Sequence, residues 1–340
     1  MKYKSLRIKY NGCFTHSNRL HCKSHIVQYK ALKQAIIAFI VEVYERGKIY
    51  KMNDCVIKWT GSKRTQASKI VDMFPDNFET YYEPFIGGGS ILIELLNRHS
   101  IKFNRIICSD INNDLINLWI LIKQNPTEII EQYTKRWLEM QSAHSEPERK
   151  EIYLHYRDRY NTYHDVHDFY FVRNTCYNGM VRYNSDGHFN VGYHFHRSGA
   201  NPNLLENILI NTNYLLNKFD IKFICQQYDK IRPDSDDFCY FDPPYEDSKS
   251  LYTGDFNNIK FIDFVNKLNC KWLLSYDGDV ENSSEFKVIE KLNHKNLFLL
   301  NAGISSYRKL KNIGALNVRE ALYTNYDIGE ARNLLNYSLF

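Results

Sequence analysis

Residues 238–245 read Phe-Cys-Tyr-Phe-Asp-Pro-Pro-Tyr, an apolar run that turns abruptly into an acid, two prolines and a tyrosine. A short apolar run rich in aromatic residues is typical of a buried strand, and proline does not continue a central strand. We therefore predict a strand over residues 237–241, directly followed by Asp242. In open α/β sheets, ligands bind beyond the carboxyl ends of the strands. This strand end is thus the first candidate for a functional site.

Asp242 and the residues that follow it suit a planar base with an exocyclic amine. The two prolines restrict the backbone, so the Asp242 carboxylate and the Pro243 carbonyl stand as rigid acceptors for the two N–H groups of such an amine. Tyr245 adds a flat face on which the base can stack, and the nitrogen lone pair then turns toward an electrophile. The candidate catalytic residues are Asp242, Pro243, Pro244 and Tyr245. A proline-rich turn without chemistry is the alternative.

Strands alternate with helices on both sides of this stretch. The predicted strands cover residues 80–83, 105–109, 221–225, 237–241 and 271–275, and the predicted helices cover residues 90–97 and 112–124. Asn112 or Asn113 can cap the second helix, which stops before Pro126. This alternation predicts an α/β fold.

Two further segments have the composition of a small-molecule site. Glu83-Pro84-Phe85-Ile86-Gly87-Gly88-Gly89 lies between a strand and a helix, where glycines let the backbone approach a ligand closely. It is not a G-x-G-x-x-G pattern, so a dinucleotide is not indicated. Asp110 ends the next strand and can meet the ribose hydroxyls of a nucleoside cofactor, or it can cap a helix. Residues 58–64 combine Trp59 with Lys63 and could close over a carboxylate-bearing cofactor; a basic surface loop is the alternative.

Residues 127–220 read as a mostly helical insert in the α/β pattern and hold 7 of the 12 histidines. Within them, residues 180–195 alternate around Ser185-Asp186-Gly187, which predicts a hairpin. Residues 169–197 contain eight Phe or Tyr, three Arg, three His and a single acid. Basic residues interleaved with aromatic ones suit phosphates and splayed bases, although an ordinary hairpin that packs its aromatic residues inward has the same composition.

Charge is unevenly distributed along the chain. The net charge is +5, but residues 1–69 hold 15 Lys or Arg against 3 Asp or Glu, and the remainder holds 29 against 36. A basic front indicates a polyanionic partner, or alternatively a solvated tail. No run of eighteen apolar residues and no signal peptide is present, so we expect no membrane span, no secretion and a cytoplasmic location.

The eight cysteines form no C-x-x-C pair, and we expect buried free thiols. Residues 13–25 contain two cysteines and three histidines whose spacing loosely allows zinc, namely Cys13, His16, His21, Cys22 and His25. They match no zinc-finger pattern, and we expect no metal.

Together these segments resemble the Dam-type DNA adenine methyltransferases. Five motifs carry the resemblance, in the order of the family: K-W-x-G-x-K-R, E-P-F-x-G-G-G, S-D-I-N-x-D-L-I-N, Y-N-G-x-x-R-Y-N-x-x-G-x-F-N-V and Y-x-D-P-P-Y. The resemblance covers about residues 57–325. It implies a seven-stranded, mostly parallel sheet with helices on both faces, S-adenosylmethionine as cofactor, and a target-recognition region between a cofactor half and a catalytic half. The implied activity is site-specific methylation of the exocyclic amino nitrogen of adenine in duplex DNA, by base flipping, in a restriction-modification or orphan modification enzyme.

The resemblance also implies residue roles. The cofactor-binding residues would be Trp59, Lys63, Glu83, Pro84, Phe85, Gly87, Gly89, Asp110, Tyr228 and Asp242, with Lys63 near the cofactor carboxylate. The DNA-binding residues would be Tyr177, Asn178, Arg182, Asn184 and Asn190. The expected parts are a basic extension (1–51), a cofactor-binding part (52–126), a target-recognition insert (127–220) and a catalytic part (221–340).

The chain departs from the family after Val191. Many members continue with P-F-G-R, whereas Gly192-Tyr193-His194-Phe195 stand here, so the resemblance does not extend to recognition of GATC. Three alternatives remain: an amine methyltransferase that acts on RNA, one that acts on a protein glutamine, or a DNA-binding regulator without activity. A cognate restriction endonuclease that acts on the same sequence is a candidate partner, but the sequence indicates neither whether one exists nor the oligomeric state.

Overall fold

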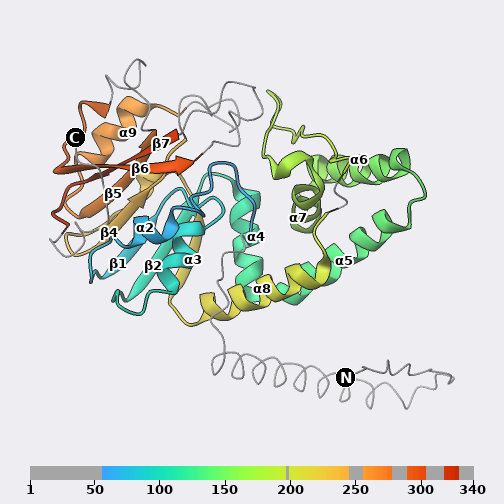
Figure 1. Cartoon of the computed structure of the whole chain (residues 1–340), viewed down its shortest axis with the longest axis horizontal. Helices are drawn as coiled ribbons and strands as arrows, with labels where there is room; N and C mark the ends of the chain where they lie inside the picture. Colours follow the sequence, from blue (N-terminus) through green and yellow to red (C-terminus); the bar gives the residue numbers. More distant parts are fainter. Residues whose placement is uncertain (1–55, 197–198, 245–255, 278–288, 304–317, 329–340) are drawn as a thin grey trace, which may run out of the picture. The chain divides into compact units, whose positions relative to one another are not determined.

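The computed structural model describes residues 56–196, 199–244, 256–277, 289–303 and 318–328. The basic extension (1–51), which includes the Cys/His cluster of residues 13–25, lies outside these ranges. Seven strands form one sheet in the order β3-β2-β1-β4-β5-β7-β6 (Figure 1). They are β1 (Thr80–Glu83), β2 (Arg105–Asp110), β3 (Ile221–Cys225), β4 (Phe238–Phe241), β5 (Lys271–Asp277), β6 (Asn296–Gly303) and β7 (Val318–Thr324).

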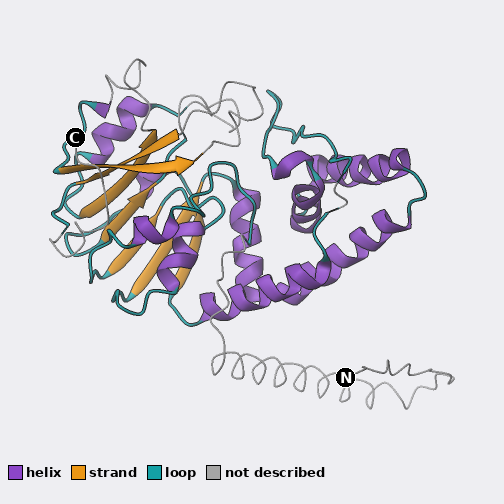
Figure 2. Cartoon of the chain, in the orientation of Figure 1, coloured by secondary structure: helices purple, strands orange, loops and turns teal. Residues whose placement is uncertain are grey.

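The first five strands are parallel, and β7 pairs antiparallel with both β5 and β6. Alternate side chains feed two hydrophobic layers: Tyr81 and Tyr240 point into one, and Tyr82 and Phe241 into the other. Helices α2 (Ala67–Val71), α3 (Ser90–Leu96) and α4 (Asn113–Gln124) pack in the first layer, and α9 (Asn258–Val265) packs in the second (Figure 2). Parallel sheets need both faces covered. The predicted α/β sheet with helices on both faces is therefore confirmed.

The strand order creates a switch point beside β1. The chain runs outward from β1 to β2 and β3 on one side, and to β4 and β5 on the other. Crevices at such a reversal open at the carboxyl ends of the strands. Glu83, Asp110 and Asp242 stand at or directly after the ends of β1, β2 and β4, so the topology brings three acids predicted from separate motifs to one edge.

Four helices lie between α4 and β3: α5 (Pro126–Ser142), α6 (Glu146–Tyr163), α7 (Val166–Thr175) and α8 (Pro202–Asn217). Each begins at a polar cap whose side chain accepts a backbone N–H bond: Asn125, Ser145, Asp165 and Asn201. Asn112 caps α4 in the same way, as the sequence predicts. None of the described helices has the length and apolar character needed to cross a membrane.

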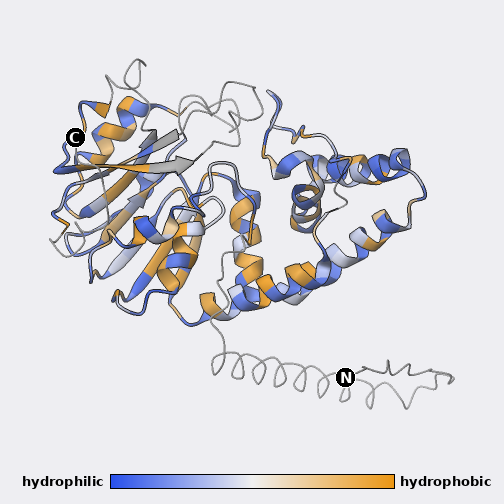
Figure 3. Cartoon of the chain, viewed as in Figure 1, coloured by the Kyte–Doolittle hydropathy of each residue, from blue (hydrophilic) through white to orange (hydrophobic). Residues whose placement is uncertain are grey.

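The buried side chains of α6 are all tyrosines, Tyr153, Tyr156 and Tyr160. With its many charged residues, α6 is far more hydrophilic than α3 (Figure 3). The hydroxyls of Tyr133 and Tyr153 donate to backbone oxygens of Ala200 and Val191 at 2.8 and 2.7 Å. A buried tyrosine needs such a partner. These bonds therefore hold α5 and α6 against the segment that leads into α8.

The predicted hairpin is present as two antiparallel bridges, Tyr183 with Phe189 and Cys176 with Tyr193. We refer to residues 180–195 as the hairpin. The five cysteines in the described ranges are free thiols. The expected burial is confirmed for four of them and is wrong for Cys225, which is exposed.

Candidate active site and nucleic-acid interface

Lys63 lies at the centre of the carboxyl edge. Its Nζ is 2.7 Å from Oδ1 of Asp242 and 3.2 Å from Oε1 of Glu320, and the lysine side chain is only 6% exposed. Burial acts to lower the pKa of Lys63, but the two carboxylates outweigh it and the pKa is raised. Lys63 therefore stays charged and holds the Asp242 carboxylate in a defined orientation.

Sequence reasoning missed Glu320. This residue is in β7, opposite Asp277 of β5, and is 5% exposed. The available signal was a single acid directly before the apolar run Ala321-Leu322-Tyr323. A buried acid in a strand requires a partner, but nothing in the sequence identified Lys63 as that partner.

Glu83 is buried beneath Asp242 at the end of β1 and accepts a bond of 3.0 Å from the Tyr81 hydroxyl. Burial raises the pKa of Glu83 to about 8; the charge of Asp242 adds to the rise and the Tyr81 bond opposes it. A carboxyl with this pKa is largely protonated at neutral pH. It can therefore donate a hydrogen bond, and it places no second full charge beside Asp242.

The glycine turn is crowded by the protein itself. Gly87 and Gly89 have φ angles of +47° and +65°, a region that favours glycine. A Cβ on Gly88 would lie 2.6 Å from the carbonyl oxygen of Ile57, and one on Gly87 would lie 2.8 Å from the Trp59 ring. Trp59 thus packs directly against the main chain of residues 87–89 at the edge of the sheet.

Asp110 is tied to this turn. Its Oδ2 accepts from the Gly87 N–H at 3.2 Å, and its Oδ1 accepts from the Asn112 N–H at 3.0 Å. Burial raises the pKa of Asp110 to about 6, against the effect of these bonds. Because Asn112 is the cap of α4, the alternative interpretation of Asp110 as that cap is wrong.

Phe85 and Tyr228 form an aromatic surface beside the turn. Their rings stack with centroids 5.6 Å apart and an angle of 27°, and Phe261 packs edge-on against both. Pro84 and Pro243 are buried next to the ends of β1 and β4. Tyr245 lies outside the described residues.

Of the five predicted DNA contacts, two are exposed in a turn before the hairpin and three form hydrogen bonds within the hairpin. Tyr177 and Asn178 are exposed in a tight turn in which Asn178 has a φ of 54°. The Arg182 guanidinium donates to the Asn190 side chain at 2.7 Å, so these two residues brace the strands of the hairpin. Asn184 holds the loop, because its Oδ1 accepts from the N–H groups of Asp186 and His188 at 3.1 and 2.8 Å.

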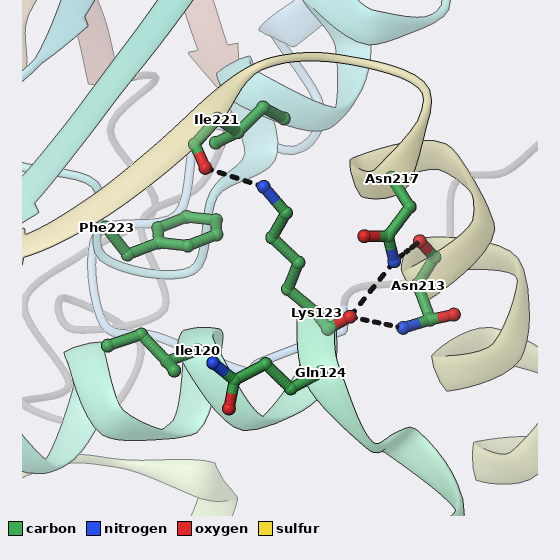
Figure 4. A pocket seen from close by; sticks show the side chains of 7 residues that line it. All are labelled: Ile120, Lys123, Gln124, Asn213, Asn217, Ile221 and Phe223. Carbon is green, nitrogen blue, oxygen red and sulfur yellow. Dashed lines mark hydrogen bonds between the residues drawn. The ribbon is translucent and has the colours of Figure 1, made fainter.

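A cavity of about 560 Å³ lies elsewhere, between α4, α8 and the amino end of β3 (Figure 4). Lys123 donates to the Ile221 carbonyl at 2.6 Å, and Asn213 and Asn217 donate to the Lys123 carbonyl. None of the predicted site residues lines this cavity. Lys123, Asn213 and Asn217 thus form hydrogen bonds with neighbouring groups of the cavity and cap the carboxyl end of α4.

Comparison with known proteins identifies the family of the chain. Residues 59–312 match the family model of the D12 class N6 adenine-specific DNA methyltransferases. Type II methyltransferase M.MjaIII of Methanocaldococcus jannaschii is 34% identical over 237 residues, which cover 63% of this chain and 79% of that protein. A DNA adenine methylase of Vibrio cholerae is 32% identical over 202 residues, covering 57% and 66%. The solved rRNA methyltransferase aviRa of Streptomyces viridochromogenes covers 84% of this chain and 96% of its own at 11% identity, with a TM-score of only 0.35.

The fold and the edge site define an α/β methyltransferase, and the chain belongs to the D12 class of N6 adenine-specific DNA methyltransferases. It is therefore a site-specific enzyme that methylates the exocyclic amino nitrogen of adenine in DNA, with base flipping, as the sequence predicts. Membership of this family implies S-adenosylmethionine as methyl donor.

Proposed function

We propose that the crevice at the carboxyl ends of β1, β2 and β4 holds both the methyl donor and the flipped adenine. The observation that carries this proposal is the placement of Asp242, fixed by buried Lys63 at the switch point of the sheet. Donor and acceptor of the methyl group must meet in one place, and this edge joins the glycine turn to the residues after β4.

The residues at the turn fit S-adenosylmethionine, which supplies an electrophilic methyl group on its sulfonium sulfur. Asp110 stands at the end of β2 with a carboxylate that can accept from ribose hydroxyls. Phe85 and Tyr228 offer apolar ring faces to an adenine ring. The proposed cofactor-binding residues are Trp59, Lys63, Glu83, Pro84, Phe85, Gly87, Gly89, Asp110, Tyr228 and Asp242.

Asp242 would take part in the chemistry by accepting from the target amine together with the Pro243 carbonyl. Two fixed acceptors hold the N–H groups and leave the nitrogen lone pair free to attack. Because Lys63 and Glu320 pair in the same buried cluster, Lys63 keeps a carboxylate partner when the base engages Asp242. Catalysis then comes from orientation and from preorganised charge, and stacking on Tyr245 would offset part of the few kcal/mol that flipping costs.

Replacing Asp242 tests this assignment. Asp242→Ala should reduce methyl transfer to duplex DNA below about a tenth of wild type, since one acceptor can contribute on the order of a hundredfold, while DNA affinity stays within about twofold. Transfer of tritiated methyl groups and fluorescence anisotropy measure the two properties. Asp236→Ala removes an exposed carboxyl ahead of the same strand and is the matched control. Retention of a tenth or more of the activity in Asp242→Ala would contradict the proposed role.

We further propose that duplex DNA is contacted by Tyr177, Asn178, Arg182, Asn184 and Asn190. We also propose that the enzyme acts in the compartment that holds this DNA. A third proposal is that a restriction endonuclease recognises the same sequence. Single-molecule sequencing of DNA from cells that express the protein identifies the methylated sequence. Methylated DNA from these cells and unmethylated DNA from cells that lack the protein can then be exposed to extracts of the host. If the extract cuts only the unmethylated DNA, at the sequence that the enzyme methylates, the result supports a cognate endonuclease. If both DNA samples survive equally, the result argues that the enzyme acts without an endonuclease.

A further inference from the structure

The hairpin is attached to the candidate cofactor site by a partly buried polar contact that no predicted site residue makes. Asn112 Nδ2 donates to the Tyr183 hydroxyl at 3.2 Å, and this hydroxyl lies 3.1 Å from that of Tyr160. Tyr160 in turn donates to Asp114 at 2.6 Å. Tyr183 stands between Arg182 and Asn184, so its hydroxyl fixes the segment that carries two proposed DNA contacts.

Asn112 connects this contact to the end of β2. Its backbone N–H donates to Asp110 at 3.0 Å, while its side-chain oxygen caps α4 by accepting from Leu115 at 2.9 Å. The other oxygen of Asp110 holds Gly87. A single asparagine therefore touches the proposed ribose-binding acid, the start of a helix and the hairpin.

A second connection joins the same strand of the hairpin, at Val181, to the segment that packs against the turn. The Val181 N–H approaches the Thr60 hydroxyl at 3.4 Å, next to Trp59. The Arg173 guanidinium lies 5.0 Å from the centre of the Trp59 ring, which packs against Gly87. The hairpin is thus connected to the glycine turn by two routes, one through Asn112 and one through Thr60. A shift of that turn on cofactor binding would be transmitted to it.

We propose that Tyr183 is a positioning residue that couples occupancy of the cofactor site to the placement of the hairpin on DNA. The coupling is reciprocal: cofactor tightens specific DNA binding, and specific DNA tightens cofactor binding by the same factor. This inference rests on the proposed function, because it takes Asp110 as a cofactor ligand and the hairpin as a DNA contact.

Tyr183→Phe tests the proposal, because it removes the hydroxyl and keeps the ring that packs edge-on against Phe189 at 5.8 Å. The measurement is the dissociation constant for a duplex containing the methylated sequence, with and without saturating S-adenosylhomocysteine. In wild type we expect the ligand to tighten binding by about fivefold or more, and in Tyr183→Phe by less than about twofold. Affinity for random duplex and for S-adenosylhomocysteine alone should stay unchanged.

Asn112→Ser provides an independent variant, since serine preserves the helix cap but does not reach Tyr183. It should lose the coupling to the same extent, and the double variant should lose no more than either single one. Tyr163→Phe, on α6, removes a hydroxyl from a side chain that is 73% exposed and should behave as wild type. Coupling that persists in Tyr183→Phe, or is absent from a wild type that binds S-adenosylhomocysteine, overturns this inference alone. A wild type that fails to bind S-adenosylhomocysteine overturns the proposed function as well.

Discussion

At the scale of single residues, the edge site combines groups whose charges depend on one another. Lys63 is paired with two carboxylates, and Glu83 beside them has a pKa raised to about 8 by burial. At neutral pH the edge site therefore holds one cation, two carboxylates and one largely neutral acid, namely Lys63, Asp242, Glu320 and Glu83. A neutral Glu83 lowers the repulsion on Asp242 and leaves that carboxylate as the acceptor.

Glu83 makes a prediction about pH and stability. Its pKa in the folded protein lies above the usual value of 4.5, so between these values the folded state binds more protons and the free energy of unfolding falls as pH rises. The loss from this residue is at most about 1.4 kcal/mol per pH unit. Glu83→Gln, which keeps the shape without the titration, should unfold with a weaker dependence on pH between 5 and 8 in urea titrations.

The matched control is Glu131→Gln, which neutralises an exposed acid of α5. It should follow the pH dependence of wild type. Equal slopes for wild type and Glu83→Gln would show that Glu83 ionises in the folded protein as it does in water.

At the scale of elements, the turn between β1 and α3 joins catalytic geometry to packing. The indole N–H of Trp119 donates to the Gly87 carbonyl at 3.0 Å, and its ring lies where a Cβ of Gly89 would stand. The positive φ angles and this close approach explain why glycines occupy the turn. The turn contacts Trp119 of α4 on one side and Trp59 on the other.

Gly89→Ala should lower the free energy of unfolding by roughly 2–4 kcal/mol, because the left-handed conformation is unfavourable and the added methyl group meets Trp119. Gly187→Ala is the comparison: its φ is +78°, but nothing lies within 4 Å of the added Cβ. There we expect only the conformational loss of roughly 1–2 kcal/mol. Urea unfolding measures both variants, and equal losses would contradict the packing argument.

At the scale of the whole described molecule, the helices α5–α8 share one hydrophobic cluster with the sheet. Tyr133 and Tyr160 belong to the same buried cluster as Tyr81 and Phe238. Within the helices, Asp168 is fully buried between Arg136 at 2.9 Å and Arg159 at 3.0 Å. Because the core is continuous, the helical insert and the sheet should unfold together.

Asp168→Ala should therefore destabilise both regions, by roughly 3–5 kcal/mol, since it leaves the buried guanidinium of Arg136 without this carboxylate. Hydrogen exchange followed by mass spectrometry should show equal loss of protection in α7 and β4. Asp158→Ala, which removes the 68% exposed carboxylate of a surface pair with Arg157, should change little. Loss confined to α7 would indicate an insert that unfolds by itself.

The local part of this architecture follows from the sequence. The positions of β1 to β5, the glycine turn, the Asn112 cap and the acids at the ends of β1, β2 and β4 depend on residues close together in the chain, whose spacing and backbone preferences are visible in the sequence. Parallel strands place their carboxyl ends at one edge, so the meeting of these acids could also be predicted.

Only the tertiary structure decided which distant side chains meet. Lys63 pairs with Glu320 of the antiparallel strand β7, and Tyr183 of the hairpin reaches Asn112 beside the sheet. Such pairs join residues from opposite parts of the chain, and no local pattern specifies them. They exist because a buried polar group must find a partner wherever packing of the core places it.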